Sequence, residues 1–536
     1  MIKKIISLFL VIIITVSFFC SCSRDKSIVL FVAVDKKASS FDPQIAKGDT
    51  TRIIVRNCFE GLVSLNEDGS LGKGVAESWE VSDDGLIYTF HLRDDAVWHL
   101  TSNAKEQLEG KIPEDFAPHV TASDFVFALR RAVDPANKST DAYMFMNIAG
   151  AQDIYQKKIP ATSLGVKALS DTELQIKLAK KQSNFPEMLL SPAAMPCNET
   201  FFNACTGRYG TYIKFLLSNG PFYLSRFDDS SYRINKNPDY TGEHTPKADA
   251  VWLYCISDRE KLMNELKEDE YSCAMLSSAE YQNFASSKNK AVTESENIIR
   301  SLIFNITDSY LSCPDLRRAF AAATNASLIA DNAGREYYGS FVPRCASFED
   351  VTVHPVMYNE KNAVKYLGQA FTQLDISNLS LDILCEKQYE ELMRKMLQEW
   401  QRILGVNVAL SVVPVTEAEL DSALAKGEFQ IAFCPLKADA ANAYEYFGNY
   451  TPSKNSSVTG YANASVTSML TELYSGDDSK AKSVYSKLEQ KLADVSFMIP
   501  VWTEKTYFIS TKDVSGVIAG DNADMLYLYN ATNKKG

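Results

Sequence analysis

The sequence predicts an α/β protein with a mostly parallel sheet, and the stretch from Leu379 to Cys434 carries most of that prediction. Three short segments alternate apolar and polar side chains as strands do, and two helical segments separate them, each ending in a glycine, Gly405 and Gly427. Strands joined by helices in this way form a parallel sheet with helices on its faces. The elements expected in order are strand 379–383, helix 392–403, strand 406–412, helix 417–426 and strand 429–433.

In sheets of this kind, ligands bind at the carboxyl ends of the strands. The segment that directly follows Phe433, at the end of the third strand, is therefore a candidate binding loop.

Earlier segments add further elements. Residues 28–34 are apolar throughout and predict a buried strand, and residues 86–92 alternate behind an Asp-Asp-Gly turn and predict a second one. Thr121 to Asp124 forms a capping box, and the helix behind it presents one apolar face. The polar, irregular stretch 100–119 is expected to be a surface insertion.

Size and charge limit the possibilities. A chain of 536 residues is too long for one compact core and predicts two or three domains. The formal net charge of −12 disfavours a nucleic-acid partner, because binding to phosphates needs a basic face.

The N-terminus predicts the compartment. Lys3 and Lys4 precede an apolar run over residues 5–19, which suits a signal peptide better than a membrane span. The small Ser21 directly before Cys22 resembles a bacterial lipoprotein cleavage site, although Phe19 stands where Leu is usual. We expect residues 1–22 to be a lipoprotein signal that ends at a lipidated Cys22, tethering the protein outside the cytoplasm, in the periplasmic space or at the cell surface. A plain cleaved signal and an uncleaved anchor are the alternatives.

The other nine cysteines are scattered and include no Cys-x-x-Cys pair, which argues against a zinc or thioredoxin-type motif. Disulfides and free buried thiols both remain open. The sequence also lacks a nucleophile elbow, a metalloprotease helix, a Walker loop and a dinucleotide fingerprint. We therefore expect no catalytic residues, no metal and no cofactor.

One segment resembles a known family. Residues 75–93 read Val-Ala-Glu-Ser-Trp-Glu-Val-Ser-Asp-Asp-Gly-Leu-Ile-Tyr-Thr-Phe-His-Leu-Arg, which is similar to the signature of family 5 extracellular solute-binding proteins, the peptide-binding components of ABC importers. Residues 160–169 resemble the oligopeptide-binding branch in particular. Other matching segments follow the family order, at residues 41–43, 59–62, 120–125, 134–135, 219–222, 236–240, 304–305, 314–319, 404–406 and 499–501.

The resemblance implies a periplasmic-binding-protein type of fold, with two lobes, mixed sheets and a pear-shaped, three-domain architecture. Domain I is expected to combine residues 28–60, 182–300 and 504–536; domain II covers residues 61–181 and domain III, the second lobe, residues 301–503. Ligand is enclosed between the lobes by hinge closure, as an extended strand held through its main chain. The implied partners are a short peptide and ABC permease subunits, and the protein is expected to be a monomer.

Four ligand-binding residues follow from the resemblance. Asp439 lies in the loop where relatives pair an aspartate with the α-ammonium of the peptide; Thr459 and Tyr143 fall near other family contact positions. Phe433, Tyr389 and Leu424 stand where relatives place cations for the ligand carboxylate. Lys437 is the candidate substitute for that lost charge.

The missing cations leave alternatives open. The carboxylate of the ligand is solvated, or the ligand is a non-standard one such as a cell-wall peptide, haem or a metal chelate. In a third reading, the same fold serves as a surface binding protein or adhesin.

Overall fold

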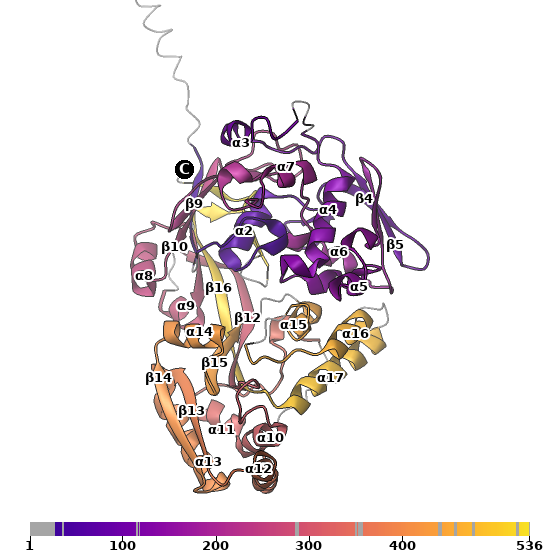
Figure 1. Cartoon of the computed structure of the whole chain (residues 1–536). Helices are drawn as coiled ribbons and strands as arrows, with labels where there is room; N and C mark the ends of the chain where they lie inside the picture. Colours follow the sequence, from indigo (N-terminus) through magenta and orange to yellow (C-terminus); the bar gives the residue numbers. More distant parts are fainter. Residues whose placement is uncertain are drawn as a thin grey trace, which may run out of the picture.

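A computed structural model describes residues 27–34, 37–113, 116, 118–284, 289–348, 351, 357–437, 442–454, 458–473, 478–520 and 525–534 (Figure 1). The predicted signal peptide with Cys22, and the predicted ligand residue Asp439, lie outside the described residues.

A ten-stranded mixed sheet runs through the molecule. It contains two parallel sets: β1 pairs in parallel with β10 and β11, and β13 pairs in parallel with β14 and β15. This mixture of parallel and antiparallel pairs confirms the predicted fold class. Across the sheet the order is β14 (Val408–Val415), β13 (Leu379–Glu386), β15 (Ile431–Lys437), β12 (Asn289–Phe304), β16 (Met498–Thr511), β11 (Cys273–Ser277), β1 (Val29–Val34), β10 (Ala250–Cys255), β9 (Ser231–Lys236) and β8 (Phe222–Phe227).

The two longest strands, β12 and β16, connect the parallel sets. They pair antiparallel along most of their length and run from the wider upper part of the molecule into the narrower lower part (Figure 1). Their register shifts between Ser295 and Ile298 and again between Arg300 and Ser301. Such irregularities bend a strand and increase its local twist. The two strands are therefore expected to bend at these residues, where they pass from the upper part into the lower part.

The lower part confirms the predicted β-α-β-α-β segment. Between its strands lie α13 (Glu390–Leu404) and α14 (Glu417–Lys426), which end at Gly405 and Gly427 as expected. With α10 (Pro314–Ala323) and α12 (Glu360–Leu374), α13 covers a core centred on Trp400, whose ring centroid lies 4.7 Å from that of Phe320. The prediction that the second strand begins at Val406 was wrong: Val406 is fully exposed, because it follows the helix-ending glycine in a turn, and β14 begins at Val408.

The opposite face of the lower sheet is covered by α15 (Ala443–Gly448), α16 (Ala464–Leu473) and α17 (Asp478–Val495) (Figure 1). Successive residues of β15 therefore enter different cores: Phe433 packs with Trp400, whereas Cys434 belongs to the core that contains these later helices.

The upper part holds a smaller sheet in the order β4 (Ala76–Val81), β5 (Ile87–Leu92), β7 (Glu173–Lys177), β6 (Val166–Ser170). Next to it lies α4 (Ala122–Val133), whose capping box between Thr121 and Asp124 is present as predicted. The remaining helices and strands are α2 (Asp49–Cys58), α5 (Ala151–Tyr155), α6 (Phe185–Met188), α7 (Glu199–Ala204), α8 (Arg259–Lys267), α9 (Ser278–Phe284), α11 (Ala326–Asn332), β2 (Val63–Leu65), β3 (Leu71–Lys73), β17 (Val514–Ser515), β18 (Ile518–Ala519), β19 (Leu526–Tyr527) and β20 (Thr532–Asn533).

The stretch 100–119 is more than the expected irregular surface insertion. It contains α3 (Ser102–Gln107), and both Ala104 and Leu108 are completely buried. These two residues are four positions apart, so they share one face of the helical turn, and that face packs into the core.

Six cysteines are free thiols rather than members of disulfides, the two alternatives that the sequence left open; they are at positions 58, 197, 205, 313, 385 and 434. None of the helices in the described part of the chain combines the length and the hydropathy that crossing a bilayer requires.

Candidate functional site

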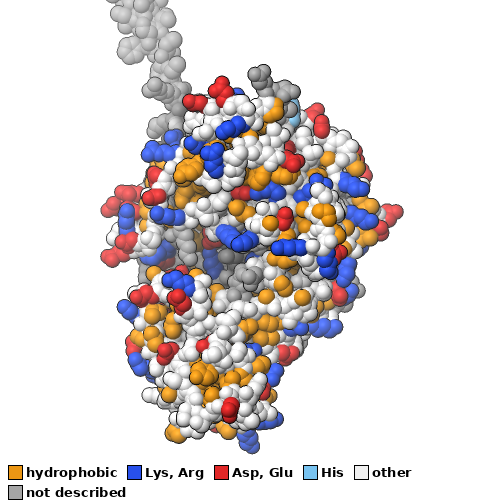
Figure 2. All heavy atoms as spheres, viewed as in Figure 1, with side chains coloured by type: hydrophobic (Ala, Val, Ile, Leu, Met, Phe, Trp, Pro, Cys, Tyr) orange, Lys and Arg blue, Asp and Glu red, His pale blue; other side chains and the backbone are white. Residues whose placement is uncertain are grey.

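The two parallel sets of strands present their carboxyl ends to one another. In the upper part these ends lead into α8 and α9, and in the lower part they lead into α13, α14 and the loop after Lys437 (Figure 1). Charges of Arg259 on α8 and Glu280 on α9 act on Glu417 at the start of α14, so the two edges lie close together. We call this region the junction; Figure 2 shows the surface hollowed along it.

An ion pair joins the two sides of the junction. The ammonium of Lys437, the last residue of β15, lies 2.7 Å from a carboxylate oxygen of Asp49, the first residue of α2. About a third of each side chain is exposed, so the pair is partly screened by water. Lys437 therefore lies at the junction, but its charge is already matched by that of Asp49.

Tyr143 lies at the junction as well. It belongs to a short 3-10 helix, Ala142–Phe145, and is almost completely buried. Its ring stacks on that of Tyr444 in α15, with centroids 6.2 Å apart, and the ammonium of Lys454 lies 4.9 Å from the ring centroid. Tyr444 also donates a hydrogen bond of 3.4 Å to the Tyr143 carbonyl. Elements of the upper and lower parts thus touch directly through Tyr143.

The phenol of Tyr143 has an unusual environment. Among the described residues, none hydrogen-bonds to its buried oxygen. Burial, together with the carboxylates of Glu445 and Asp141, raises the pKa of this phenol well above its ordinary value. Tyr143 therefore stays neutral, with a hydroxyl able to donate one hydrogen bond and accept others.

Asp141 fixes the Tyr143 helix to α2. Arg52 donates to both carboxylate oxygens of Asp141, at 3.0 and 2.9 Å, and Ser191 donates to one of them. Burial acts to raise the pKa of Asp141, but Arg52 and the hydrogen bond from Ser191 hold it below its ordinary value. The first turn of α2 therefore supports the junction twice, with Asp49 toward Lys437 and Arg52 toward Asp141. Asp49 and Arg52 were not predicted as site residues, because no sequence motif marks a helix whose neighbours come from distant segments.

Thr459 is buried at the end of β12. Its carbonyl accepts a hydrogen bond of 3.1 Å from the Ile306 amide, and its hydroxyl accepts one of 3.4 Å from the Tyr461 amide. These contacts are internal to the lower part, whereas those of Tyr143 and Lys437 cross the junction.

Two of the three positions expected to have lost their cations lie against an arginine. Arg300 on β12 is buried, and its guanidinium carbon lies 4.7 Å from the ring centroid of Tyr389 and 5.8 Å from that of Phe433. Leu424, the third such position, is a partly buried core residue on α14. No sequence pattern predicts that a cation from another strand lies against Tyr389 and Phe433.

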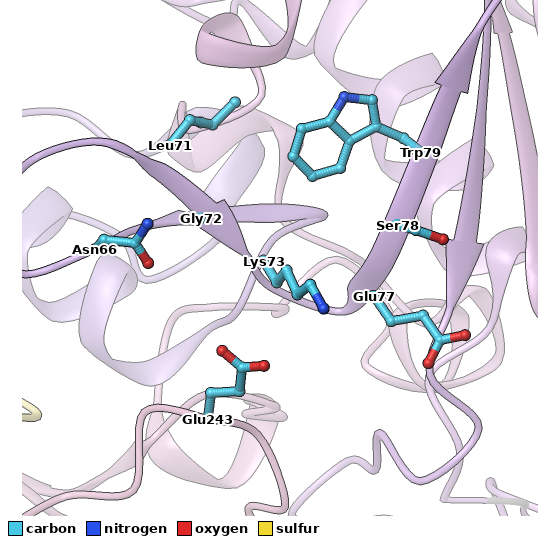
Figure 3. A pocket seen from close by; sticks show the side chains of 8 residues that line it. All are labelled: Asn66, Leu71, Gly72, Lys73, Glu77, Ser78, Trp79 and Glu243. Atoms are coloured by element: carbon cyan, nitrogen blue, oxygen red, sulfur yellow. The ribbon is translucent and has the colours of Figure 1, made fainter.

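A second hollow lies on the upper part. It has a volume of about 650 Å³ and is open to solvent, with the Trp79 indole of β4 directed toward Leu71 (Figure 3). Lys73 and Glu77 lie beside each other in it, and Glu243 points toward them from a loop. It shares no lining residue with the junction. In the described ranges, no group of three or more His, Cys, Asp or Glu side chains could hold a metal ion.

Comparisons with known proteins agree with this geometry. The profile described as bacterial extracellular solute-binding proteins, family 5 Middle, matches residues 71–458. The dipeptide-binding protein DppE of Bacillus subtilis is 24% identical over 507 residues, which cover 91% of this chain and 89% of that protein. The periplasmic oligopeptide-binding protein OppA of Salmonella typhimurium is 25% identical over 522 residues, covering 92% and 90%.

Solved structures show the same fold. The structure of Listeria monocytogenes OppA bound to peptide superposes with a TM-score of 0.74 at 21% identity, over 96% of this chain and 100% of that one. The substrate-binding domain of an oligopeptide ABC transporter from Bacillus anthracis gives a TM-score of 0.75 at 19% identity, over 95% and 100%. The periplasmic-binding-protein type of fold, which the family resemblance implied, is thereby confirmed.

Proposed function

Because the chain belongs to the bacterial extracellular solute-binding proteins of family 5, we propose that it captures short peptides outside the cytoplasm and delivers them to the permease of an ABC importer. Membership of a family of binding proteins confirms the prediction that the chain is not an enzyme. The choice of ligand is supported by the relatives, which are named as dipeptide- and oligopeptide-binding proteins.

One observation carries the proposal: the carboxyl ends of both parallel sets meet at the junction, which is where α/β proteins bind ligands. Contacts across it, between Lys437 and Asp49 and between Tyr143 and Tyr444, belong to a closed arrangement of the two parts. The buried hydroxyl of Tyr143 offers a hydrogen bond to an enclosed main chain.

The hinge in this proposal is the pair of long strands. Domain I would comprise residues 28–60, 182–300 and 504–536, domain II residues 61–181 and domain III residues 301–503. Both β12 and β16 pass through these boundaries, next to the register shift at Arg300 and Ser301. A change of a few backbone angles there would separate the lobes without breaking either core.

A thermal-shift series tests the function. A peptide at about 100 times its Kd adds roughly 2.7 kcal/mol to the free energy of unfolding. Peptides of two to eight residues should raise the melting temperature, and N-acetylation should weaken the effect more than C-amidation, because we assign Asp439 to the α-ammonium of the ligand. If no peptide shifts the melting temperature, the proposed function is wrong; if acetylation changes nothing, the role of Asp439 is wrong.

The anchor is a separate part of the proposal. A lipid on Cys22 would keep the protein at the membrane, since each buried methylene contributes about 0.8 kcal/mol to partitioning. Cys22→Ser should move the protein from the membrane fraction to the soluble fraction in its native host. A variant that stays with the membrane would contradict lipidation at this residue.

A further inference from the structure

The carboxyl edge of the lower sheet carries one row of side chains. Glu386, the last residue of β13, stands beside Val415 of β14, while Arg300 of β12 stands between Pro435 of β15 and Trp502 of β16. Glu386 and Arg300 meet across β15 with a contact of 2.5 Å. This row forms the lower wall of the junction.

The cation in this row is fully neutralised by the protein itself. Every guanidinium nitrogen of Arg300 donates to a carboxylate: one terminal nitrogen to Glu386, and the other two nitrogens to Glu504 at 3.0 and 3.2 Å. The rings of Tyr389 and Phe433 cover the guanidinium, so Arg300 is only 4% exposed. One arginine between two carboxylates leaves a net charge of −1, and each nitrogen of Arg300 already donates to a carboxylate of the protein.

Two further cations at the junction are also paired with carboxylates. Lys437 pairs with Asp49 at 2.7 Å, and Arg259 donates to both oxygens of Glu280 at 2.7 and 2.6 Å. At each of these three cations, a ligand carboxylate would have to displace a carboxylate of the protein.

Two exposed carboxylates add further negative charge to this edge. Glu417 and Asp421, one turn apart at the start of α14, are both exposed. Partial desolvation raises the pKa of Glu417, and the neighbouring charges of Glu386 and Asp421 raise it further, while Arg259 opposes them. Together the side chains named in these paragraphs comprise three cations and six carboxylates, a net charge of −3. The exposed Lys387 adds one cation, and it acts on a further carboxylate, Glu419.

We propose that this edge is an anionic subsite of the peptide cleft, which favours a peptide with a lysine or arginine side chain and disfavours one with a carboxylate at the same place. Glu417 is the determining residue, because it is exposed and lies close enough to Glu386 of this row for the two charges to interact. The inference rests on the proposed peptide-binding function and adds the charge of the preferred ligand. A lysine would keep its long apolar stem along Tyr389 and direct its ammonium to Glu417.

A charge scan of one short peptide tests it. In tetra-alanine, each position from two to four is replaced in turn by lysine, by norleucine, which has a similar stem without the charge, or by glutamate, and Kd is measured by calorimetry with the purified protein. At one position, lysine should bind about tenfold more tightly than norleucine, and glutamate about tenfold less tightly. Raising the salt from 50 to 500 mM should weaken the lysine peptide more than the norleucine peptide.

Variants locate the effect. Glu417→Gln should reduce the lysine-to-norleucine ratio to about threefold or less, and it leaves the ion pairs of Arg300 intact. Glu80→Gln, an exposed carboxylate on β4, removes the same charge elsewhere and should leave the ratio unchanged. Equal binding of all three peptide types at every position, or a ratio unaffected by Glu417→Gln, overturns the inference alone. Failure of every peptide to bind overturns the proposed function with it.

Discussion

Replacing Gly448 by alanine should hinder closure of the cleft while leaving both lobes folded. Gly448 ends α15 on the lower side of the junction and faces the ring of Tyr143 on the upper side. A β-carbon at this position would lie 2.2 Å and 2.5 Å from two ring carbons. Carbon atoms in contact sit about 3.5–4.0 Å apart, so the two surfaces would have to separate by roughly 1.5 Å.

The expected loss of peptide affinity depends on how far the Tyr143 ring can move. Its ring is 1% exposed and stacked on Tyr444, so it has no room to turn aside. Overpacking of this kind costs about 1–3 kcal/mol. If that cost falls on the closed state alone, peptide affinity should drop by about 5- to 150-fold, because each 1.4 kcal/mol is a factor of ten.

Calorimetry with a peptide that binds the unaltered protein measures the loss, and small-angle scattering of the same complex should show a larger radius of gyration. Gly368→Ala on α12 is the matched control: a β-carbon there meets nothing within 4 Å, so affinity should be unchanged and stability should rise by about 0.5–1 kcal/mol. Affinity within twofold of the unaltered protein would refute the closure argument for Gly448→Ala. A matching loss of stability without peptide would show that the contact belongs to the resting fold instead.

Three further outcomes are expected. Lys437→Ala should weaken peptide binding by less than about fivefold, since its partly exposed pair with Asp49 is worth at most about 1 kcal/mol; a double-mutant cycle that gives a larger coupling would contradict this. Trp400→Ala should lower the free energy of unfolding in urea by about 3–5 kcal/mol, because the indole is fully buried and donates to the Thr324 hydroxyl at 3.0 Å. Burial raises the pKa of Asp124 to about 6, so between about pH 4 and 6 the folded chain holds a proton that the unfolded chain releases. Stability should therefore fall as pH rises through this window, by about 3 kcal/mol relative to Asp124→Asn, and urea titrations that show parallel pH profiles would exclude the effect.

Local patterns were enough to predict much of the fold. The alternation at 379–383, the apolar face of α13 and the glycines at its end and at the end of α14 each act within a few residues, so the β-α-β-α-β unit was visible in the sequence. The errors are local as well. Val406 fits the strand alternation but is held in the turn after Gly405, and Ala104 and Leu108 form a buried face too short to stand out in a polar stretch.

The junction was less predictable, because its contacts join residues hundreds of positions apart. Asp49 of the upper part meets Lys437 of the lower part, and the segment around Tyr143 meets α15. The periodicity of apolar residues is a local pattern, so it does not predict contacts between such distant residues. The resemblance to a family could direct attention to Tyr143 and Lys437, but it could not show that Lys437 is already paired.

The departures at Tyr389 and Phe433 are best understood as one arrangement with Arg300. In the sequence alone, each position lacks a cation that relatives of the family have there. In the structure, both rings lie against a guanidinium that two carboxylates neutralise. A cationic side chain in place of Phe433 would lie within about 6 Å of Arg300, and the two positive charges would repel each other. Only a reorientation of Glu386 or Glu504 toward the new cation would relieve this repulsion. The aromatic side chains and the buried arginine therefore depend on each other: rings are compatible with Arg300 at these positions because they add contact without adding charge. This arrangement of Arg300 between Glu386 and Glu504 leaves the row with a net charge of −1.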